Sequence, residues 1–364
     1  MKKLAAFLLA ALMAVSATAC SSGTGSSSEA SSKASSQAAS AAGSSSAAAT
    51  NYKILMVTDT GGVNDQSFNQ LSWEGLQQLE KDVPGVKANY SESKQESDYA
   101  TNLDKAADDG NQLIWGVGYA MADALQNAAK QNPDIGYAII DNAYETVPSN
   151  VTCVVFRAQE PSFLVGYIAG KTTKTNKVGF VGGQKSDVID QFEYGYKAGV
   201  AYAAKELNKK IDVVSQYAES FVDSAKGKAI AKSMYSGGCD IVFHAAGNVG
   251  VGVIEAAKEA NKYAIGVDKD QAFLAPNNVL TSAMKRVDKA VEQVSKDAVD
   301  GKEIGGKTYS LGLTEDGVGI PEEHKLMGDD TYKAAMALEQ KIKDKEIVPP
   351  ASKDDYDAFI KALK

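Results

Sequence analysis

The chain has 364 residues, of which 44% are hydrophobic and 23% are charged, and its formal net charge is −8. This length suggests about two domains of ~100–200 residues each. The acidic balance argues against a nucleic-acid-binding protein, which needs a basic face to neutralise phosphates. With only two histidines, His244 and His324, a histidine-based metal centre or a Ser-His-Asp hydrolase is not expected. These exclusions leave two classes of protein: a soluble binding protein, or an enzyme that does not use histidine.

The first 20 residues have the pattern of an export signal. Residues 1–3 are basic at two positions, residues 4–15 are apolar and uncharged, and small residues lead to Cys20. This pattern is typical of a secretory signal, and its apolar part is shorter than the about 20 residues that span a bilayer. Cys20 resembles the lipidated cysteine of a bacterial lipobox, although Ala17 stands where that motif usually has Leu. We predict lipidation at Cys20; the alternative is a plain secretory signal cut after Ala19.

Residues 21–50 consist almost wholly of Ser, Ala and Gly. So few large apolar side chains cannot offset the entropy of ordering the backbone, which predicts a disordered linker. Its root-mean-square reach is roughly 30 Å. Together with a lipid anchor, this linker would hold a folded domain at the extracytoplasmic face of a cell membrane.

The rest of the chain alternates between short apolar stretches and stretches with helical periodicity. The first series predicts strands at 52–57, 112–115, 136–140 and 151–156, and helices at 67–81, 99–109, 121–131 and 163–172. The alternation then restarts, with strands at 177–183, 213–217, 240–244 and 263–267 and helices at 189–207, 225–235 and 251–259. Two such series predict an α/β protein with two parallel sheets covered by helices.

Ligands of such sheets bind at the carboxyl ends of the strands. Asp59, Asp141 and Asp268 each follow or end a predicted strand, and Phe68 and Phe221 lie close to such positions. Carboxylates accept hydrogen bonds from vicinal hydroxyls, and aromatic faces stack on heterocycles. Because carboxylates repel phosphate, these residues favour a nucleoside or a sugar over a nucleotide.

Several of these residues also have a purely structural interpretation. An Asp after a strand is often a helix cap, and Asp123 and Asp223 have the strongest cap character. Phe68 fits a core position, Lys285 fits a solvated surface, and the pair Gly182-Gly183 fits a tight turn. No dinucleotide fingerprint follows the first predicted strand.

Seven stretches of the sequence together resemble the basic membrane protein family, bacterial lipoproteins that bind purine nucleosides and feed ABC transporters. The first reads VTDTGGVNDQSFNQ over residues 57–70 and continues through Trp73-Glu74-Gly75. The others lie at residues 116–119, 156–160, 163–170, 243–247, 266–271 and 280–285. The resemblance extends over nearly all of the chain after residue 50.

This resemblance implies a type I periplasmic-binding-protein fold, in which two doubly wound parallel-sheet lobes close on a ligand in the cleft between them. The chain would cross between the lobes three times, near residues 156–159, 271–276 and 312–317. The expected lobe 1 is 51–157 with 273–314, and the expected lobe 2 is 158–272 with 315–364.

The resemblance also implies ligand contacts. Phe68 and Phe221 would sandwich the base, Gly247 would let the backbone approach it, and Asp268 and Lys285 would hold the ribose hydroxyls. The remaining expected contacts are Asp59, Thr60, Asn69 and Asp141. Asp123 is an alternative to Asp141 in the same lobe.

The expected function is therefore capture of purine nucleosides such as guanosine, inosine or adenosine, and their delivery to an ABC permease. No enzymatic activity, cofactor or metal is expected. A sugar-binding protein of the same fold and a surface receptor without a transport role remain open. A hydrolase or dehydrogenase is disfavoured, since it needs a nucleophile–base pair or a dinucleotide fingerprint, and the sequence shows neither.

Overall fold

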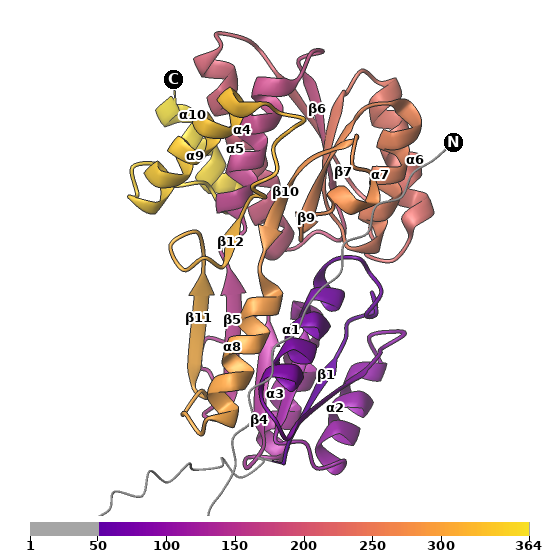
Figure 1. Ribbon diagram of the computed structural model, residues 1–364, viewed down its shortest axis with the longest axis vertical. Coiled ribbons are helices and arrows are strands. Elements are labelled where there is room, and N and C mark those ends of the chain that lie inside the picture. The colour runs from indigo at the N-terminus through magenta and orange to yellow at the C-terminus, as the bar shows by residue number, and fades with distance from the viewer. Residues whose placement is uncertain (1–50, 364) are drawn as a thin grey trace, which may run out of the picture. The chain divides into compact units, whose positions relative to one another are not determined.

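The computed structural model describes residues 51–363, and two six-stranded sheets organise this part of the chain. The strand order is β11-β5-β4-β3-β1-β2 in one sheet and β12-β10-β9-β8-β6-β7 in the other. We call the sheets with their covering helices lobe 1 and lobe 2, seen below and above in Figure 1. The predicted signal, Cys20 and the linker at 21–50 lie outside the described residues.

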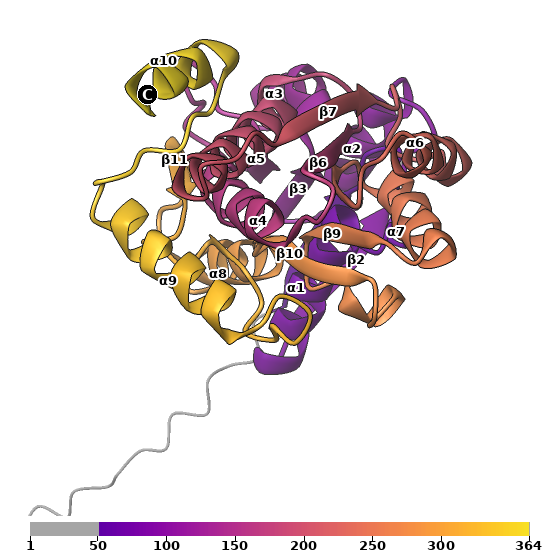
Figure 2. The ribbon, with the colours of Figure 1, turned by 90° about the horizontal axis from the view of Figure 1, so that it is seen from above.

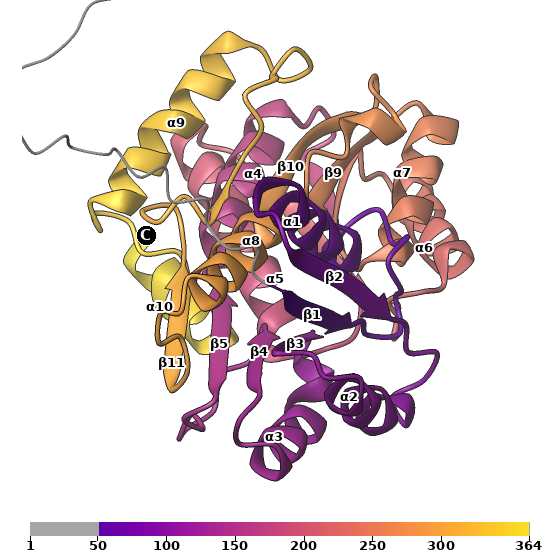
Figure 3. The same ribbon diagram turned by 60° about the horizontal axis from the view of Figure 1, so that its bottom comes forward.

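Every strand pair of lobe 1 is parallel, as the alternating pattern predicts. Helices α1 and α8 pack against each other on one side, as do α2 and α3, and Figure 3 shows α8 beside α1 although they are far apart in the sequence. The elements of lobe 1 are β1 (Tyr52–Val57), α1 (Phe68–Asp82), β2 (Val86–Ser91), α2 (Asp98–Asp108), β3 (Leu113–Val117), α3 (Ala122–Gln131), β4 (Gly136–Ile140), β5 (Val151–Phe156), α8 (Val287–Val299) and β11 (Lys307–Leu311).

Lobe 2 repeats this plan, with the short β12 antiparallel to β10 at one edge. Helices α4 and α5 pack together, as do α6 and α7, and α9 and α10 cover α4 and α5 from outside (Figure 2). The elements of lobe 2 are α4 (Gln159–Thr172), β6 (Lys177–Gly182), α5 (Asp187–Glu206), β7 (Asp212–Tyr217), α6 (Ser224–Ser236), β8 (Ile241–Ala245), α7 (Asn248–Ala260), β9 (Tyr263–Asp268), β10 (Val279–Lys285), β12 (Val318–Gly319), α9 (Asp329–Lys343) and α10 (Lys353–Leu363).

The central strands are buried on both faces, which explains their continuous apolar sequences. All five residues of β3 and of β8 are buried. Trp115 in β3 also donates a hydrogen bond from Nε1 to Ser295 Oγ of α8 at 2.9 Å. Full burial of one such large side chain stabilises the fold by about 1.5–3 kcal/mol, so the central strands anchor both lobes.

All predicted strands and helices are present, with ends that differ from the prediction by four residues at most. The sequence prediction missed β2, α8, β11, β12, α9 and α10, and it treated residues 280–285 only as a motif. Among the described residues, no helix is both long and apolar enough to cross a bilayer.

The chain passes between the sheets at three places: after β5, after β10 and after β11. The first and third lie at the predicted positions, but the predicted crossing at 271–276 is wrong. There the chain makes the short 3₁₀ turn Ala272–Leu274 and returns to the same sheet as β10, which pairs with β9. Residues 273–285 therefore belong to lobe 2, and the second crossing follows Lys285.

Ionic contacts join the first and third crossings. Arg157 Nε donates to Glu160 Oε1 at 2.6 Å, and its guanidinium also pairs with Glu315. Glu160 Oε2 in turn accepts a hydrogen bond from Leu313 N at 2.7 Å. These contacts hold two connecting segments side by side between the lobes.

Candidate functional site

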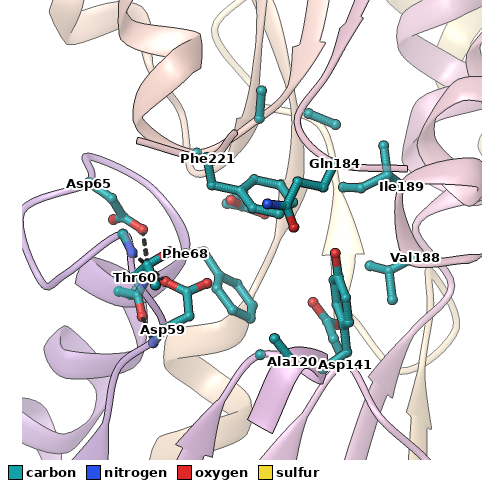
Figure 4. Close-up of a pocket in the computed structure, with 18 of the residues that line it drawn as sticks. Asp59, Thr60, Asp65, Phe68, Ala120, Asp141, Gln184, Val188, Ile189 and Phe221 are labelled. Atoms are coloured by element: carbon teal, nitrogen blue, oxygen red, sulfur yellow. Dashed lines mark hydrogen bonds between the residues drawn. The ribbon is translucent and has the colours of Figure 1, made fainter. Parts of the chain in front are cut away.

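A pocket lies between the lobes at the carboxyl ends of strands from both sheets (Figure 4). All nine residues that the sequence singled out as ligand contacts line it, namely Asp59, Thr60, Phe68, Asn69, Asp141, Phe221, Gly247, Asp268 and Lys285. The rival candidate Asp123 does not line this pocket. The structure thus brings together, from stretches far apart in the chain, the residues selected as strand-end and motif positions.

A hydrogen-bonded acidic cluster forms the lobe 1 wall. Asn69 donates from Nδ2 to Asp59 Oδ1 at 2.7 Å and to Asp65 Oδ2 at 3.0 Å. Gly61 N donates to the same Asp59 oxygen at 2.8 Å. Because these donors occupy Oδ1, the other oxygen of Asp59 is left to face the pocket.

Asp65 fixes the start of α1. Its carboxylate accepts hydrogen bonds from the backbone N–H groups of Ser67, Asn69 and Gln70 at 2.8–3.1 Å. These are groups that the first turn of a helix leaves without a backbone partner. Asp65 thereby holds Phe68, the first residue of α1, at the edge of the pocket.

Burial changes the protonation of two pocket carboxyls. Loss of hydration raises the pKa of Asp59 to about 6, against the lowering effect of the hydrogen bonds from Gly61 and Asn69. Burial likewise raises the pKa of Asp268 to about 6, although Lys285 and the hydroxyl of Ser67 both lower it. Both groups therefore change charge close to neutral pH.

Lys285 is a buried cation at the centre of the site. Its ammonium group pairs with Asp141 of lobe 1, and both side chains are almost fully buried. Lys285 Nζ also lies 4.6 Å from the ring centroid of Phe68 and 5.2 Å from that of Phe156, within the range of cation–π attraction. The interpretation of Lys285 as a surface residue is wrong.

The ring of Phe221 lies against backbone that only glycine permits. Phe221 is in the loop between β7 and α6, and a Cβ on Gly183 would lie 2.2 Å from its ring. Gly247 has a φ of +54°, and a Cβ there would lie 3.2 Å from the Phe221 carbonyl oxygen. The Gly182-Gly183 pair thus makes room for aromatic rings, since a Cβ on Gly182 would meet Tyr217 in the same way.

The two phenylalanines come from opposite lobes. Figure 4 shows Phe221 above and Phe68 below the open part of the pocket in that view, with Asp59 and Gln184 reaching toward the same space. Asp223, in contrast, caps α6 by accepting from Lys226 N at 2.9 Å, as the cap interpretation predicts.

The sequence reasoning missed several lining residues. Tyr119 follows β3 and Gln184 follows β6, so both lie near strand ends where the rule places ligand contacts. Neither residue was among the candidates selected from the sequence. The others have no strand-end signal because they lie on helices or in a loop: Asp65, Glu96, Tyr99, Val188, Ile189 and Phe192.

Two lobes around a pocket at their strand ends define the type I periplasmic-binding-protein class, and solved structures agree. A solute-binding protein of an ABC transporter system from Aeropyrum pernix K1 superposes with a TM-score of 0.78 at 29% identity, covering 86% of this chain and 97% of that one. An ABC transporter solute-binding protein from Agrobacterium vitis, bound with α-D-tagatopyranose, gives a TM-score of 0.58 at 14% identity, covering 78% and 98%.

The sequence comparisons narrow this class to a family. Residues 52–353 match the family described as ABC transporter substrate-binding protein PnrA-like, and this chain belongs to it. Basic membrane protein A of Borreliella afzelii is 41% identical over 314 residues, which cover 85% of this chain and 94% of that protein. The CD4+ T-cell-stimulating antigen of Listeria monocytogenes is 43% identical over 325 residues, covering 83% and 89%. The protein is thus a substrate-binding protein of this transporter family.

Proposed function

We propose that the pocket binds purine nucleosides and that the protein delivers them to the permease of an ABC transporter. The single observation that carries this proposal is the composition of the pocket. One phenyl ring from each lobe faces it, and carboxylates outnumber cations along its wall. A flat heterocycle joined to a neutral polyhydroxyl group matches both features.

The rings of Phe68 and Phe221 supply the recognition of a base. They approach the pocket from opposite lobes, so closure of the lobes brings both faces onto a flat ligand. An aromatic contact of this kind contributes about 0.5–1.5 kcal/mol beyond the burial of area. A simple sugar has no aromatic ring that could stack between the two phenyl rings.

The charges select against phosphate. Lys285 is the one lysine or arginine among the lining residues, whereas five carboxylates line the pocket: Asp59, Asp65, Glu96, Asp141 and Asp268. A nucleotide would bring its negative charges into this wall. The vicinal hydroxyls of a ribose, in contrast, donate to a carboxylate such as Asp268 in charge-assisted hydrogen bonds worth about 1.5–3 kcal/mol each.

Closure provides the signal for transport. A ligand that contacts both lobes favours the closed arrangement by its higher affinity for that arrangement. Within this proposal, the closed protein is what the permease recognises.

The proposal includes a lipid anchor at Cys20 on the extracytoplasmic face of the membrane, on the sequence pattern of residues 1–50. Mass spectrometry of the detergent-extracted protein tests it. A diacylated N-terminal Cys20 supports the anchor, and an N-terminal residue without lipid contradicts it.

A thermal-shift panel tests the ligand class. Guanosine, inosine and adenosine are expected to raise the unfolding midpoint, whereas guanosine monophosphate, ribose and galactose leave it almost unchanged. A shift with the free sugars alone would support a sugar-binding protein, and no shift with any purine nucleoside would contradict the proposal.

A further inference from the structure

Beside the pocket, a short segment of lobe 1 contacts a short segment of lobe 2. The lobe 1 segment covers the start of α1, and the lobe 2 segment is the turn that follows β9. We call this contact the latch, made of Gln66, Ser67 and Glu74 in lobe 1 and Asp268, Lys269 and Gln271 in lobe 2.

The first latch contact reaches a pocket carboxylate directly. Ser67 is fully buried, and its Oγ donates a hydrogen bond across the lobe boundary to Asp268 Oδ2. The backbone of Ser67 is held in turn, because its N–H donates to Asp65 Oδ1 at 2.9 Å. The hydroxyl is therefore presented to Asp268 by the rigid start of α1.

The second latch contact uses both ends of one buried carboxamide. Gln271 Oε1 accepts from Val267 N at 2.9 Å inside lobe 2, and Gln271 Nε2 donates to Gln66 O of lobe 1 at 3.1 Å. Gln66 has a φ of +56°, a left-handed conformation that is uncommon for this residue type. Gln271 thus ties the turn that carries Asp268 to the loop that carries Ser67.

The third latch contact is an ion pair nearer the surface. Lys269 Nζ lies 3.0 Å and 3.2 Å from the two carboxylate oxygens of Glu74. Both side chains are partly exposed to solvent, so this pair contributes little compared with the two buried contacts.

We propose that Ser67 and Gln271 are positioning residues that fix the Asp268 carboxylate when the lobes meet, and so couple lobe closure to ligand affinity. The Asp268 carboxylate belongs to lobe 2 but has its hydroxyl donor in lobe 1. Separation of the lobes removes that donor, so the orientation of Asp268 is complete only in the closed arrangement. This inference rests on the proposed function, because Asp268 is the group assigned there to the ribose.

Three further charged groups act on Asp268 and enter any pH dependence. Lys285 at the end of β10 lowers its pKa, whereas Asp65 before α1 and Asp141 after β4 raise it. Replacement of Ser67 by Ala leaves all three in place and removes only the hydroxyl. The acid limb of the binding profile should then move to higher pH, because a donor to the ionised carboxylate is lost.

The main test compares Ser67→Ala, Ser67→Thr and Ser162→Ala by calorimetric titration of guanosine between pH 5 and pH 8. Ser162 is a matched control because it is also fully buried, lies on α4 and does not line the pocket. We expect Ser67→Ala to lose about tenfold in affinity, or about 1.4 kcal/mol, with its acid limb shifted upward. Ser67→Thr restores the hydroxyl and most of the affinity, and Ser162→Ala binds as the natural protein does.

A second variant tests the coupling to closure. Gln271→Glu keeps the side-chain shape but replaces the donor to Gln66 O with an acceptor. We expect guanosine to reduce the radius of gyration of this variant, measured by small-angle scattering, less than it does for the natural protein.

The outcomes separate the two proposals. If the natural protein binds none of guanosine, inosine and adenosine, the proposed function is contradicted. If it binds guanosine while Ser67→Ala keeps its affinity and pH profile and Gln271→Glu contracts fully, the latch proposal alone is overturned.

Discussion

The two walls of the pocket hold their charged groups in different ways. In lobe 1, Asp59 and Asp65 are satisfied by donors of the same lobe, above all Asn69. In lobe 2, Asp268 and Lys285 find partners across the cleft, in Ser67 and Asp141. Asp59 and Asp65 are therefore held within lobe 1, whereas Asp141 of lobe 1 and both Asp268 and Lys285 of lobe 2 are partnered across the cleft.

This difference gives each lobe a separate task in the proposed mechanism. In that mechanism a ligand contacts lobe 1 first, because the hydrogen bonds of Asn69 already hold Asp59 and Asp65 in place. The lobe 2 groups then add their contacts as the lobes close, which makes the closed state depend on the ligand. Variants in the two walls should therefore fail in different ways.

The largest effect on binding is expected from Asp268→Ala. This change removes the carboxylate that we assign to the ribose hydroxyls, and calorimetry should show at least a tenfold loss of guanosine affinity. Asp123→Ala serves as the control, because it removes a carboxylate of lobe 1 that does not line the pocket. Equal affinity of Asp268→Ala and the natural protein would remove the ribose role.

A smaller loss is expected from Gly183→Ala. The added Cβ would lie 2.2 Å from the Phe221 ring and must displace it, while every charge in the pocket stays in place. The loss of one aromatic contact, about 0.5–1.5 kcal/mol, corresponds to about 2–13-fold in affinity. Gly319→Ala, whose Cβ would meet no atom within 4 Å, should bind normally. If Gly183→Ala binds as tightly as Gly319→Ala, Phe221 does not stack on the ligand.

The lobe 1 wall predicts a pH dependence of stability. The pKa of Asp59 rises from 3.8 in the unfolded chain to about 6 in the folded one, so the folded state binds more protons between these values. Its contribution to stability is full below about pH 3.8 and is lost as pH rises through about 6. Asp59→Asn lacks this dependence, so urea unfolding should show the variant gaining stability relative to the natural protein from pH 4 to pH 7. A constant difference between the two would show that the carboxyl is not raised.

The smallest effect is expected from Glu74→Gln. This variant breaks the partly exposed pair with Lys269, and such pairs contribute about 0–1 kcal/mol. Guanosine affinity should change by less than about fivefold at low salt and hardly at all in 0.5 M salt. A much larger loss at low salt that disappears in 0.5 M salt would mean that the ion pair, and not the buried contacts of Ser67 and Gln271, dominates the latch.

Much of the site was predictable from the sequence, because the ligand contacts of parallel sheets lie at the carboxyl ends of the strands. Asp59, Asp141 and Asp268 each stand at or just after a strand end, so the edge rule for α/β sheets selects them without knowledge of the fold. Asn69 and Lys285 needed the family resemblance, since neither follows a predicted strand and the local pattern of Lys285 fits a solvated surface equally well.

Other features had no local signal. Val188, Ile189 and Phe192 belong to the first turns of α5, where residues that face a pocket and residues that face a core have the same spacing. The Ser67–Asp268 contact joins residues 201 positions apart. The second crossing was misplaced because the turn at 272–274 connects two strands of one sheet, β9 and β10. Only the pairing of β10 with β9 shows this, and no local sequence pattern reveals that pairing.

A crystal structure of the protein grown with guanosine tests the central claim most directly. The account predicts the purine ring between Phe68 and Phe221, with the ribose hydroxyls on the Asp268 carboxylate. A guanosine molecule bound outside the pocket, or one whose base contacts neither ring, would contradict it.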